Sequence, residues 1–234
     1  MVSLLEAARD AVLDLVFPTR CLGCDAPGQW FCETCLTASR LTRSLTHCQR
    51  CNRFTRRPGR LCGAHRQALG LHGLASLGDF HAPPLRRAIH LGKYEAVGTG
   101  LTALTTHLLE RVEPVLAAVP VGVLVPLPLS APRLRTRGYN QSLIIARELE
   151  RRTGHALSLG LTRRQDAGQQ VGRSRAERLD AMDGVFAWRG EHAPRSVILV
   201  DDVITTGATL RAAAQALRTA GAREIYALTL ADEV

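Results

Sequence analysis

The sequence predicts an α/β protein built around a mostly parallel sheet, with a small cysteine-rich module on its N-terminal side. From residue 121 onward, short continuous apolar runs alternate with segments of helical spacing, a pattern typical of a parallel sheet covered by helices on both faces. All seven cysteines lie between Cys21 and Cys62, which marks off the module. With 234 residues, 46% of them apolar, the chain can form one core of ordinary size and a small addition.

The individual elements follow from apolar periodicity and from the turn residues that flank it. We expect strands at residues 74–80 (an edge strand), 121–127, 156–161, 184–188, 197–201 and 224–230. We expect helices at residues 83–90, 97–118, 139–152 and 208–220. The polar stretch between Leu161 and Met182 is expected to include a mobile loop.

The first residues predict an amphipathic helix, because Leu5, Ala8, Val12 and Leu15 have helical spacing. This segment lacks the basic start and unbroken apolar run of a signal peptide, and no stretch reaches the ~18 apolar residues that a membrane span needs. We therefore expect a soluble, cytoplasmic protein without membrane insertion. The expected division is an N-terminal helix at 1–18, the cysteine module at 19–68 and the α/β domain at 72–234.

Four pairs of metal-binding side chains in the module share one spacing. Three pairs are Cys-x2-Cys and the fourth is Cys-x2-His, a spacing that places two ligands on one tight turn, where both reach a tetrahedral zinc ion. The ligands are Cys21, Cys24, Cys32, Cys35, Cys48, Cys51, Cys62 and His65. They make two closed sites, so we expect two structural zinc ions. Pairing in sequence order is the first expectation, and a cross-braced arrangement is the alternative.

The net charge of +9 is concentrated around this module. Between Thr34 and Gly78 the chain has eight arginines and neither Asp nor Glu. A surface of one sign is typical of a protein with an acidic partner such as nucleic acid, and the candidate contacts are Arg53, Arg56, Arg57 and Arg60. The alternative is that the arginines offset the negative charge of zinc-bound thiolates.

The segment VILVDDVITTGAT, residues 197–209, predicts a site for a phosphorylated ribose. An apolar strand ends at Asp201 and Asp202, and the chain then turns through Gly207 into a helix. Ligands of open α/β sheets bind at the carboxyl ends of strands, and a helix N-terminus offers free N–H groups to a phosphate. Ribose hydroxyls, which donate to carboxylates, account for the two acids. A helix cap alone explains a threonine but not the acid pair, and the segment lacks the pattern of a Walker A loop.

This segment resembles the phosphoribosyl pyrophosphate (PRPP) signature of type I phosphoribosyltransferases, and nearly the whole chain resembles the ComF family of competence-associated proteins. The family pattern is carried by the cysteine module, Lys93-Tyr94, VPLPLSAPRLRTRGYNQS at 125–142, a Gln- and Arg-rich loop and the signature itself. The resemblance implies a type I phosphoribosyltransferase fold with a double zinc ribbon, and Mg²⁺-bound PRPP as ligand. It also implies a role in natural transformation at the inner face of the membrane, with single-stranded DNA and a ComFA-like helicase as partners.

The resemblance also implies roles for individual residues. Asp201 and Asp202 are the expected catalytic residues. The residues expected to hold PRPP or its phosphates are Val203, Thr205, Thr206, Gly207, Ala208, Thr209, Lys93, Arg133 and Arg137. The flexible loop contributes Arg163, Arg164, Gln169, Gln170 and Arg178. Family members commonly have Asn three residues after this last arginine, where the present chain has Ala181, which puts the role of that Asn in doubt.

Lys93 is the only lysine among the 30 Lys and Arg residues. An ammonium kept in a chain that otherwise uses arginine favours a point contact to a phosphate oxygen, and the alternative is a solvated surface lysine. Three functions stay open at this point. They are a phosphoribosyl-binding domain or enzyme that acts in DNA uptake, a non-catalytic nucleic-acid-binding adaptor with a vestigial site, and a nucleotide-salvage phosphoribosyltransferase.

Overall fold

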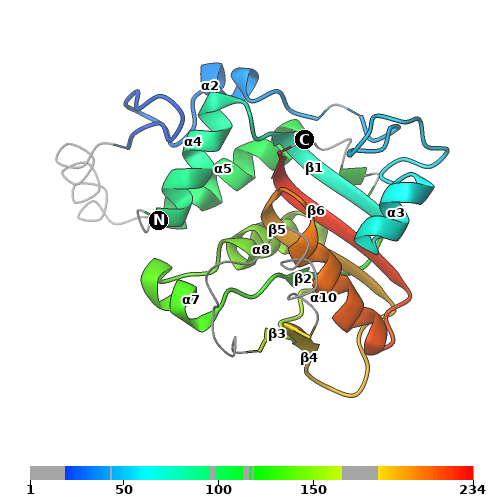
Figure 1. Ribbon diagram of the computed structural model, residues 1–234. Coiled ribbons are helices and arrows are strands. Elements are labelled where there is room, and N and C mark those ends of the chain that lie inside the picture. Colours follow the sequence, from blue (N-terminus) through cyan, green and yellow to red (C-terminus); the bar gives the residue numbers. More distant parts are fainter. Residues whose placement is uncertain are drawn as a thin grey trace, which may run out of the picture.

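The computed structural model describes residues 19–42, 44–94, 98–112, 116–117, 119–164 and 184–233. Its main sheet has four parallel strands in the order β1-β6-β5-β2, which lie side by side in Figure 1. The strands are β1 (Gly73–Asp79), β6 (Glu224–Asp232), β5 (Ser196–Ile204) and β2 (Val123–Pro126). The parallel α/β fold that the sequence predicts is therefore confirmed, with β1 at an edge as expected.

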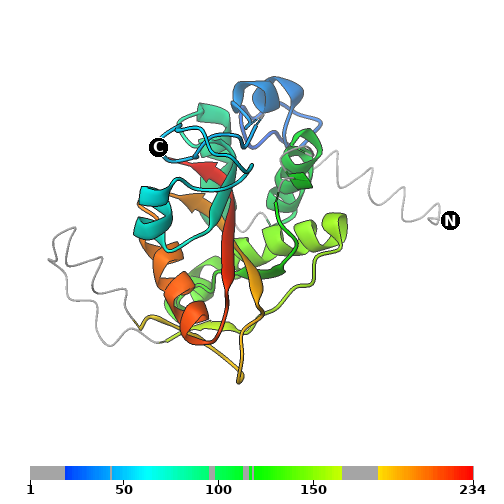
Figure 2. The same cartoon turned by 90° about the vertical axis from the view of Figure 1, so that its right-hand side faces the viewer.

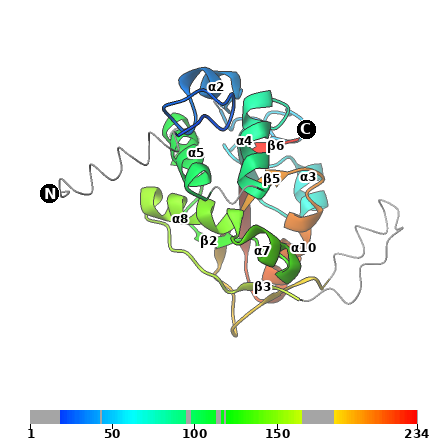
Figure 3. The ribbon, with the colours of Figure 1, turned by 90° about the vertical axis from the view of Figure 1, so that its left-hand side faces the viewer.

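Helices cover both faces of this sheet. Figure 3 looks onto the face packed against α4 (Pro83–Tyr94), α5 (Gly98–Arg111) and α8 (Gln141–Thr153). The opposite face packs against α10 (Ala208–Thr219), with α3 (Gly63–Leu69) beside it. Figure 2 shows the two layers on either side of the strands. This arrangement leaves the carboxyl ends of the strands as the place where loops and helix ends can build a site.

Strand β5 explains why the sequence reads as continuously apolar. Ile198 and Val200 belong to the hydrophobic cluster that contains α4, α5 and α8, whereas Val197 and Leu199 belong to the cluster that contains α10. Successive side chains of a strand point to opposite faces, and all four are almost fully buried. A strand with two covered faces cannot alternate polar and apolar residues.

Several expected elements differ in the structure. Residues 156–161 do not form a strand of the main sheet, because only Leu157 makes a bridge to Leu124. Instead, β3 (Leu161–Arg163) and β4 (Phe186–Trp188) pair antiparallel in a separate two-stranded sheet. Strand β5 does not end at the acid pair but continues to Ile204, since its pairing with β6 runs on to Asp232. Tertiary pairing thus overrides the low strand propensity of aspartate.

The observed helices also differ from the expected ones. The short α7 (Ala131–Arg137) forms between the strand expected at 121–127 and the helix expected at 139–152, where no element was expected. Its signals are Pro132 in the first turn and Gly138 in a left-handed conformation at the C-cap. Helix α4 runs four residues beyond the expected His90, to Tyr94. Helix α5 covers Gly98–Arg111 of the helix expected at 97–118, and residues 116–117 are helical as well, while 113–115 and 118 lie outside the described residues.

The cysteine-rich segment contains α2 (Glu33–Ala38) and α3, and it shares its core with the α/β part. Phe31 and Leu36 pack in the same cluster as α4 and α5, and Leu61 and Leu69 pack with α10. The division at residues 19–68 and 72–234 stays a prediction, and the expected helix at 1–18 lies outside the described residues. Among the helices that the structure does describe, none has the length and apolar character needed to cross a membrane.

Candidate functional site

The acid pair lies in β5 at the carboxyl edge of the sheet. Asp201 faces Thr229 of β6 in the strand register, and both aspartates are partly buried. The hydroxyl of Ser142, in the first turn of α8, donates to Asp201 Oδ1 over 3.0 Å. The backbone N–H of Asp202 donates to the same oxygen over 2.9 Å. Asp201 is therefore held by its own strand and by a neighbouring helix.

The two carboxylates have different electrostatic environments. Burial, followed by the negative charge of Asp202, raises the pKa of Asp201 to about 7, although the bonds from the Asp202 N–H and Ser142 oppose the shift. Asp202 instead pairs with Lys93, whose Nζ lies 3.0 Å from Asp202 Oδ2. The side chains of Lys93 and Asp202 are 20% and 13% exposed. At neutral pH, Asp201 is thus close to its titration point, while Asp202 has a cation beside it.

Lys93 reaches Asp202 because the end of α4 is fixed by the start of α8. The backbone carbonyl of Gly92, one residue before Lys93, accepts hydrogen bonds from Tyr139 Oη and from Gln141 Nε2. Both donors come from the GYNQS stretch around the N-cap of α8. The sequence reading placed Lys93 against a phosphate, whereas the structure brings it to an acid. The phosphate contact itself stays a prediction.

The turn between β5 and α10 has the form expected of an anion-binding helix start. Thr205 and Thr206 have exposed side chains, and the N-cap position is Gly207, with φ 78° and no side-chain cap. The Thr206 hydroxyl oxygen accepts a long hydrogen bond of 3.4 Å from the N–H of Ala208, the first residue of α10. Helix N-termini with uncapped N–H groups attract anions. Gly207 lies against Leu69 of α3, so that a Cβ at this position would collide with the leucine side chain. Among the remaining predicted loop residues, Val203, Ala208 and Thr209 are all partly buried.

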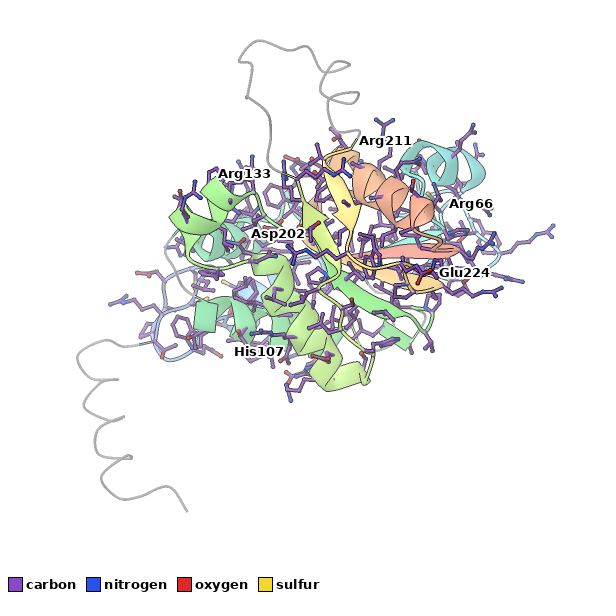
Figure 4. All side chains as sticks on the ribbon, turned by 90° about the horizontal axis from the view of Figure 1, so that it is seen from below. Arg66, His107, Arg133, Asp202, Arg211 and Glu224 are labelled. Carbon is purple, nitrogen blue, oxygen red and sulfur yellow. The ribbon has the colours of Figure 1, made fainter. Side chains whose placement is uncertain are left out.

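The described arginines predicted for this site lie on α7 and at the end of β3. Arg137, at the end of α7, donates to Gln141 Oε1 over 3.3 Å and so lies close to the start of α8. Arg133 is exposed on α7, and Figure 4 shows it on the side of Asp202 away from Arg66. Arg163, on β3, stacks over the ring of Phe186 at 5.6 Å, and Arg164 is exposed beside it. The other predicted loop residues, Gln169, Gln170, Arg178 and Ala181, lie outside the described residues.

The loop after β2 reaches the same edge of the sheet. Asn140, the N-cap of α8, uses its side-chain oxygen to accept the Ser142 N–H and its side-chain nitrogen to donate to the Leu127 carbonyl. The Leu127 N–H in turn donates to the carbonyl of Val200, directly before the acid pair. The sequence reading missed the link between Ser142 and Asp201, since no spacing in the sequence connects two residues that lie 59 positions apart.

The eight predicted metal ligands form two separate clusters, and within each cluster all ligand atoms lie within 4.8 Å of one another. The first cluster contains Cys21, Cys24, Cys32 and Cys35, and the second contains Cys48, Cys51, Cys62 and His65. Pairing in sequence order is confirmed, and the cross-braced alternative is wrong. Three cysteines with one histidine, or four cysteines, are ligand sets that suit a tetrahedral metal ion such as zinc.

The thiols within each cluster differ in their pKa values. Burial opposes ionisation of Cys21, but backbone hydrogen bonds, first from Cys32 and then from Cys24 and Gly23, lower its pKa to about 6. The backbone hydrogen bond from His65 is the main cause that lowers the pKa of Cys62 to about 6. Burial, followed by the neighbouring Cys32 thiol, raises the pKa of Cys35. Because the thiolate is the form that binds metal, backbone hydrogen bonds favour the metal-binding form at one cysteine of each cluster, Cys21 and Cys62.

The predicted nucleic-acid contacts line a cavity of about 580 Å³ beside the second cluster. Its wall has no acidic residue and consists of Arg53, Phe54, Thr55, Arg56, Arg57, Arg60, Leu61, Cys62, Gly63, Arg66 and His72. Phe54 is 65% exposed, and Arg60 stacks over the ring of Tyr226 at 5.0 Å. Burial, and then the charges of Arg66 and Arg60, lower the pKa of His72. The sequence reading missed Arg66 and His72 as part of this surface.

Comparisons with known proteins match the part of the chain that contains the acid pair. A family model described as a phosphoribosyl transferase domain matches residues 136–233, which include α8, the acid pair and α10. The chain is 37% identical over 110 residues to competence protein ComFC of Bacillus subtilis and 34% identical over 112 residues to competence protein F of Haemophilus influenzae. These matches cover 46% of this chain and 43% and 49% of the relatives, so the chain spans less than half of their length.

A longer match includes the cysteine-rich segment. The DNA utilization protein YhgH of Escherichia coli strain K12 is 30% identical over 223 residues, which covers 90% of this chain and 96% of the relative. Together with the two metal-ligand clusters and the matched phosphoribosyl transferase domain, this near-complete match shows that the chain belongs to the ComF family.

Proposed function

We propose that the protein binds Mg²⁺-PRPP, or a related ribose 5-phosphate compound, at the β5–α10 turn, and that it uses this site in DNA uptake. The observation that carries the proposal is the combination of Asp201 and Asp202 with a helix start whose N-cap residue, Gly207, has no side chain to cap it. The 5-phosphate would accept hydrogen bonds from the N–H groups and threonine hydroxyls of the turn. The ribose hydroxyls would donate to the two carboxylates.

The environment of the acids supports this proposal, because it reduces their repulsion of an anionic ligand. Two full negative charges beside a phosphate would oppose binding. Lys93 lies 3.0 Å from Asp202 and offsets one charge, and the raised pKa of Asp201 leaves the other only partly developed at neutral pH. Carboxylate oxygens also suit Mg²⁺, which would neutralise the pyrophosphate group of PRPP.

In a transfer reaction, the bond between C1 of the sugar and the pyrophosphate oxygen would break, and the electron pair would leave with pyrophosphate. Asp201 and Asp202 would stabilise the positive charge that develops on the sugar, and the acceptor would then supply the electron pair of the new bond. Arg133, Arg137, Arg163 and Arg164 are the described arginines that we assign to the pyrophosphate side.

Calorimetry on zinc-replete protein tests the site. Mg²⁺-PRPP should bind to the parent protein, and Asp201→Asn combined with Asp202→Asn should abolish binding while both zinc ions stay bound. Glu191→Gln, which removes an exposed carboxylate from another part of the chain, serves as the control. Binding that is equal in the double variant and the parent protein would overturn the assignment of the site.

The arginine-lined cavity favours a second activity of the same protein, which is binding of single-stranded DNA. Its five arginines can contact phosphates, and the exposed ring of Phe54 gives a base a surface for stacking. The names of the relatives, a competence protein and a DNA utilization protein, support a role in taking up or using DNA. A competence helicase as partner, and a place in the cytoplasm at the inner face of the membrane, complete the proposal.

The salt dependence of binding to an oligothymidylate tests the DNA interface. Replacing Arg53, Arg56, Arg57 and Arg60 by glutamine should reduce the slope of log affinity against log salt by roughly 3, since each lost phosphate contact accounts for about 0.7. A variant with Arg135, Arg189, Arg195 and Arg223 replaced by glutamine loses equal charge from exposed positions elsewhere and should change the slope much less. Equal slopes in the two variants would reject this interface.

The two tests also separate the alternatives. A protein that binds oligothymidylate but no phosphoribosyl compound would be a nucleic-acid-binding adaptor with a vestigial site. A protein that binds Mg²⁺-PRPP but not DNA, and that transfers the phosphoribosyl group to a base, would be a nucleotide-salvage enzyme.

A further inference from the structure

Arg50 connects the second metal-ligand cluster to the β5–α10 turn. It lies in the short turn between Cys48 and Cys51, and its guanidinium reaches two acceptors on the α/β part. Nη1 lies 2.5 Å from Asp232 Oδ1, and Nη2 donates to the Thr205 backbone carbonyl over 2.7 Å. The side chains of Arg50 and Asp232 are only 12% and 11% exposed. A forked, partly buried contact of this kind holds its partners in one geometry.

The second half of the same cluster contacts the turn as well. Cys62 is the N-cap of α3, His65 lies in its first turn, and Leu69 at its end packs against Gly207. One ligand pair therefore positions Arg50 on Thr205, and the other pair positions Leu69 on Gly207. Thr205 and Gly207 flank the turn in which a phosphate would bind. Both of these contacts depend on the conformation of the cluster.

The cluster has the dimensions of an occupied zinc site. Cys51 Sγ and Cys62 Sγ lie 3.7 Å apart, and His65 Nδ1 lies 3.3 Å from Cys62 Sγ and 3.7 Å from Cys48 Sγ. A tetrahedral zinc ion with Zn–S bonds of about 2.3 Å would separate two sulfurs by about 3.8 Å. A bound ion would tie the four ligands together and thereby fix the turn that contains Arg50.

We propose that Arg50 is a positioning residue for the phosphoribosyl turn, and that a metal ion on Cys48, Cys51, Cys62 and His65 controls the affinity of that turn for its ligand. The second half of this inference rests on the proposed function. Through Arg50, the metal fixes the Thr205 carbonyl and, with it, the N–H groups that follow. Because linkage is reciprocal, a ligand on the turn must tighten metal binding by the same factor.

Hydrogen exchange of the peptide spanning residues 203–209 tests the positioning role without any ligand. In zinc-replete protein, Arg50→Lys should accelerate hydrogen exchange of this peptide roughly tenfold or more. The reason is that a lysine ammonium cannot bridge Asp232 and Thr205 as the guanidinium of Arg50 does. Arg223→Lys, which makes the same change at an exposed arginine outside the proposed sites, is the control and should leave the peptide unchanged. Zinc content is measured for each variant, so that a misfolded module is recognised. Equal exchange in Arg50→Lys and the parent protein would overturn the proposal.

The rate of zinc release tests the proposed coupling between the metal at the second cluster and the ligand at the β5–α10 turn. Mg²⁺-PRPP should slow transfer of zinc from the parent protein to a chromogenic chelator, and this protection should be lost in Arg50→Lys but kept in Arg223→Lys. If Arg50 had a purely structural role, its replacement would change the rate of zinc release but not the effect of PRPP on that rate. If PRPP binds the parent protein without slowing release, the link is refuted. If PRPP does not bind at all, the proposed function and the link fail together, and hydrogen exchange alone decides the positioning role.

Discussion

Lys93 lies 3.0 Å from Asp202, while Asp201, the adjacent residue in the chain, accepts a hydrogen bond from Ser142. Two neighbouring aspartates in one strand thus have a cation and a neutral hydroxyl as their respective partners. The two carboxylates therefore have different electrostatic surroundings, and the pKa of Asp201 is the one that burial and the neighbouring Asp202 raise to about 7.

The first prediction concerns the ion pair. Lys93→Met should lower the free energy of unfolding by about 1–3 kcal/mol at pH 7.5, because it leaves two partly buried carboxylates side by side without a cation. In an Asp202→Asn background, the same change should cost much less, since the charge that needs Lys93 is gone. Urea unfolding of the four proteins gives the interaction energy as a double-mutant cycle. Additive effects of the two substitutions would show that the pair does not stabilise the fold.

The second prediction follows from the raised pKa of Asp201. Its value of about 7 lies above the ordinary 3.8, so the folded state holds the proton more tightly than the unfolded state. The contribution of Asp201 to stability is therefore fully present below pH 4 and is lost as the pH rises toward 7. The stability of Asp201→Asn relative to the parent protein should increase over this range and level off above it, as measured by urea unfolding at several pH values.

The hydroxyl of Ser142 supplies a matched control for this titration. It donates to Asp201 Oδ1 and opposes the upward shift of the pKa. Ser142→Ala should therefore move the upper end of the transition to a higher pH, in the direction opposite to the effect of Asp202→Asn, which removes a neighbouring negative charge. If both variants left the transition at the pH of the parent protein, the environment described for Asp201 would be wrong.

Local patterns in the amino-acid sequence predicted much of this fold. Apolar runs at 197–201 and 224–230 identified β5 and β6, and the spacing of the ligands identified both metal clusters and their membership. These features are local, since a buried strand or a Cys-x2-Cys turn is complete within a few residues. The signature segment likewise contains both the acids and the turn that they adjoin.

Contacts between distant segments could not be predicted in the same way. Arg50 was one of eight arginines in an acid-free segment, and nothing in the sequence distinguishes it from Arg53. Its contact with Asp232 joins residues 182 positions apart, and it arises from the way the second cluster lies along the end of β6. The partner of Lys93 was missed for the same reason. Charge and spacing predicted which residues matter, but the tertiary fold decided what each of them contacts.

The third prediction concerns Glu148 on α8. The hydrogen bond from Arg151, with further ones from Arg152 and Thr106, lowers the pKa of Glu148 to about 2, although burial opposes the shift. Its side chain is only 6% exposed, so Glu148→Gln should cost up to about 3 kcal/mol at pH 7. This stability is present above the ordinary value of 4.5 and is lost as the pH falls toward 2.

Glu150→Gln, two positions along the same helix, is the control for this prediction and should change stability much less. Unfolding by urea at pH 7 and pH 3 gives the comparison. The difference between Glu148→Gln and the parent protein should shrink at the lower pH. A difference that stayed constant with pH would mean that lost packing, and not the charge, explains the cost.

The last prediction separates two properties of Gly207. Gly207 and Gly138 have almost the same left-handed conformation, with φ of 78° and 77°, but a Cβ at 207 would collide with Leu69, whereas a Cβ at 138 would meet nothing within 4 Å. Gly138→Ala should therefore cost about 1 kcal/mol of stability from backbone strain alone. Gly207→Ala should cost about 1–3 kcal/mol more, because it also overpacks the contact with α3.

Combining Gly207→Ala with Leu69→Ala tests this origin of the cost. Removing the leucine side chain opens space for the new methyl group, so the double variant should be more stable than the sum of the single changes predicts. The affinity for Mg²⁺-PRPP should show the same pattern of loss and partial recovery. Gly207→Ala should weaken binding by displacing the start of α10, and Leu69→Ala should restore part of that loss. No restoration of either stability or binding would show that α3 does not shape the turn through this contact.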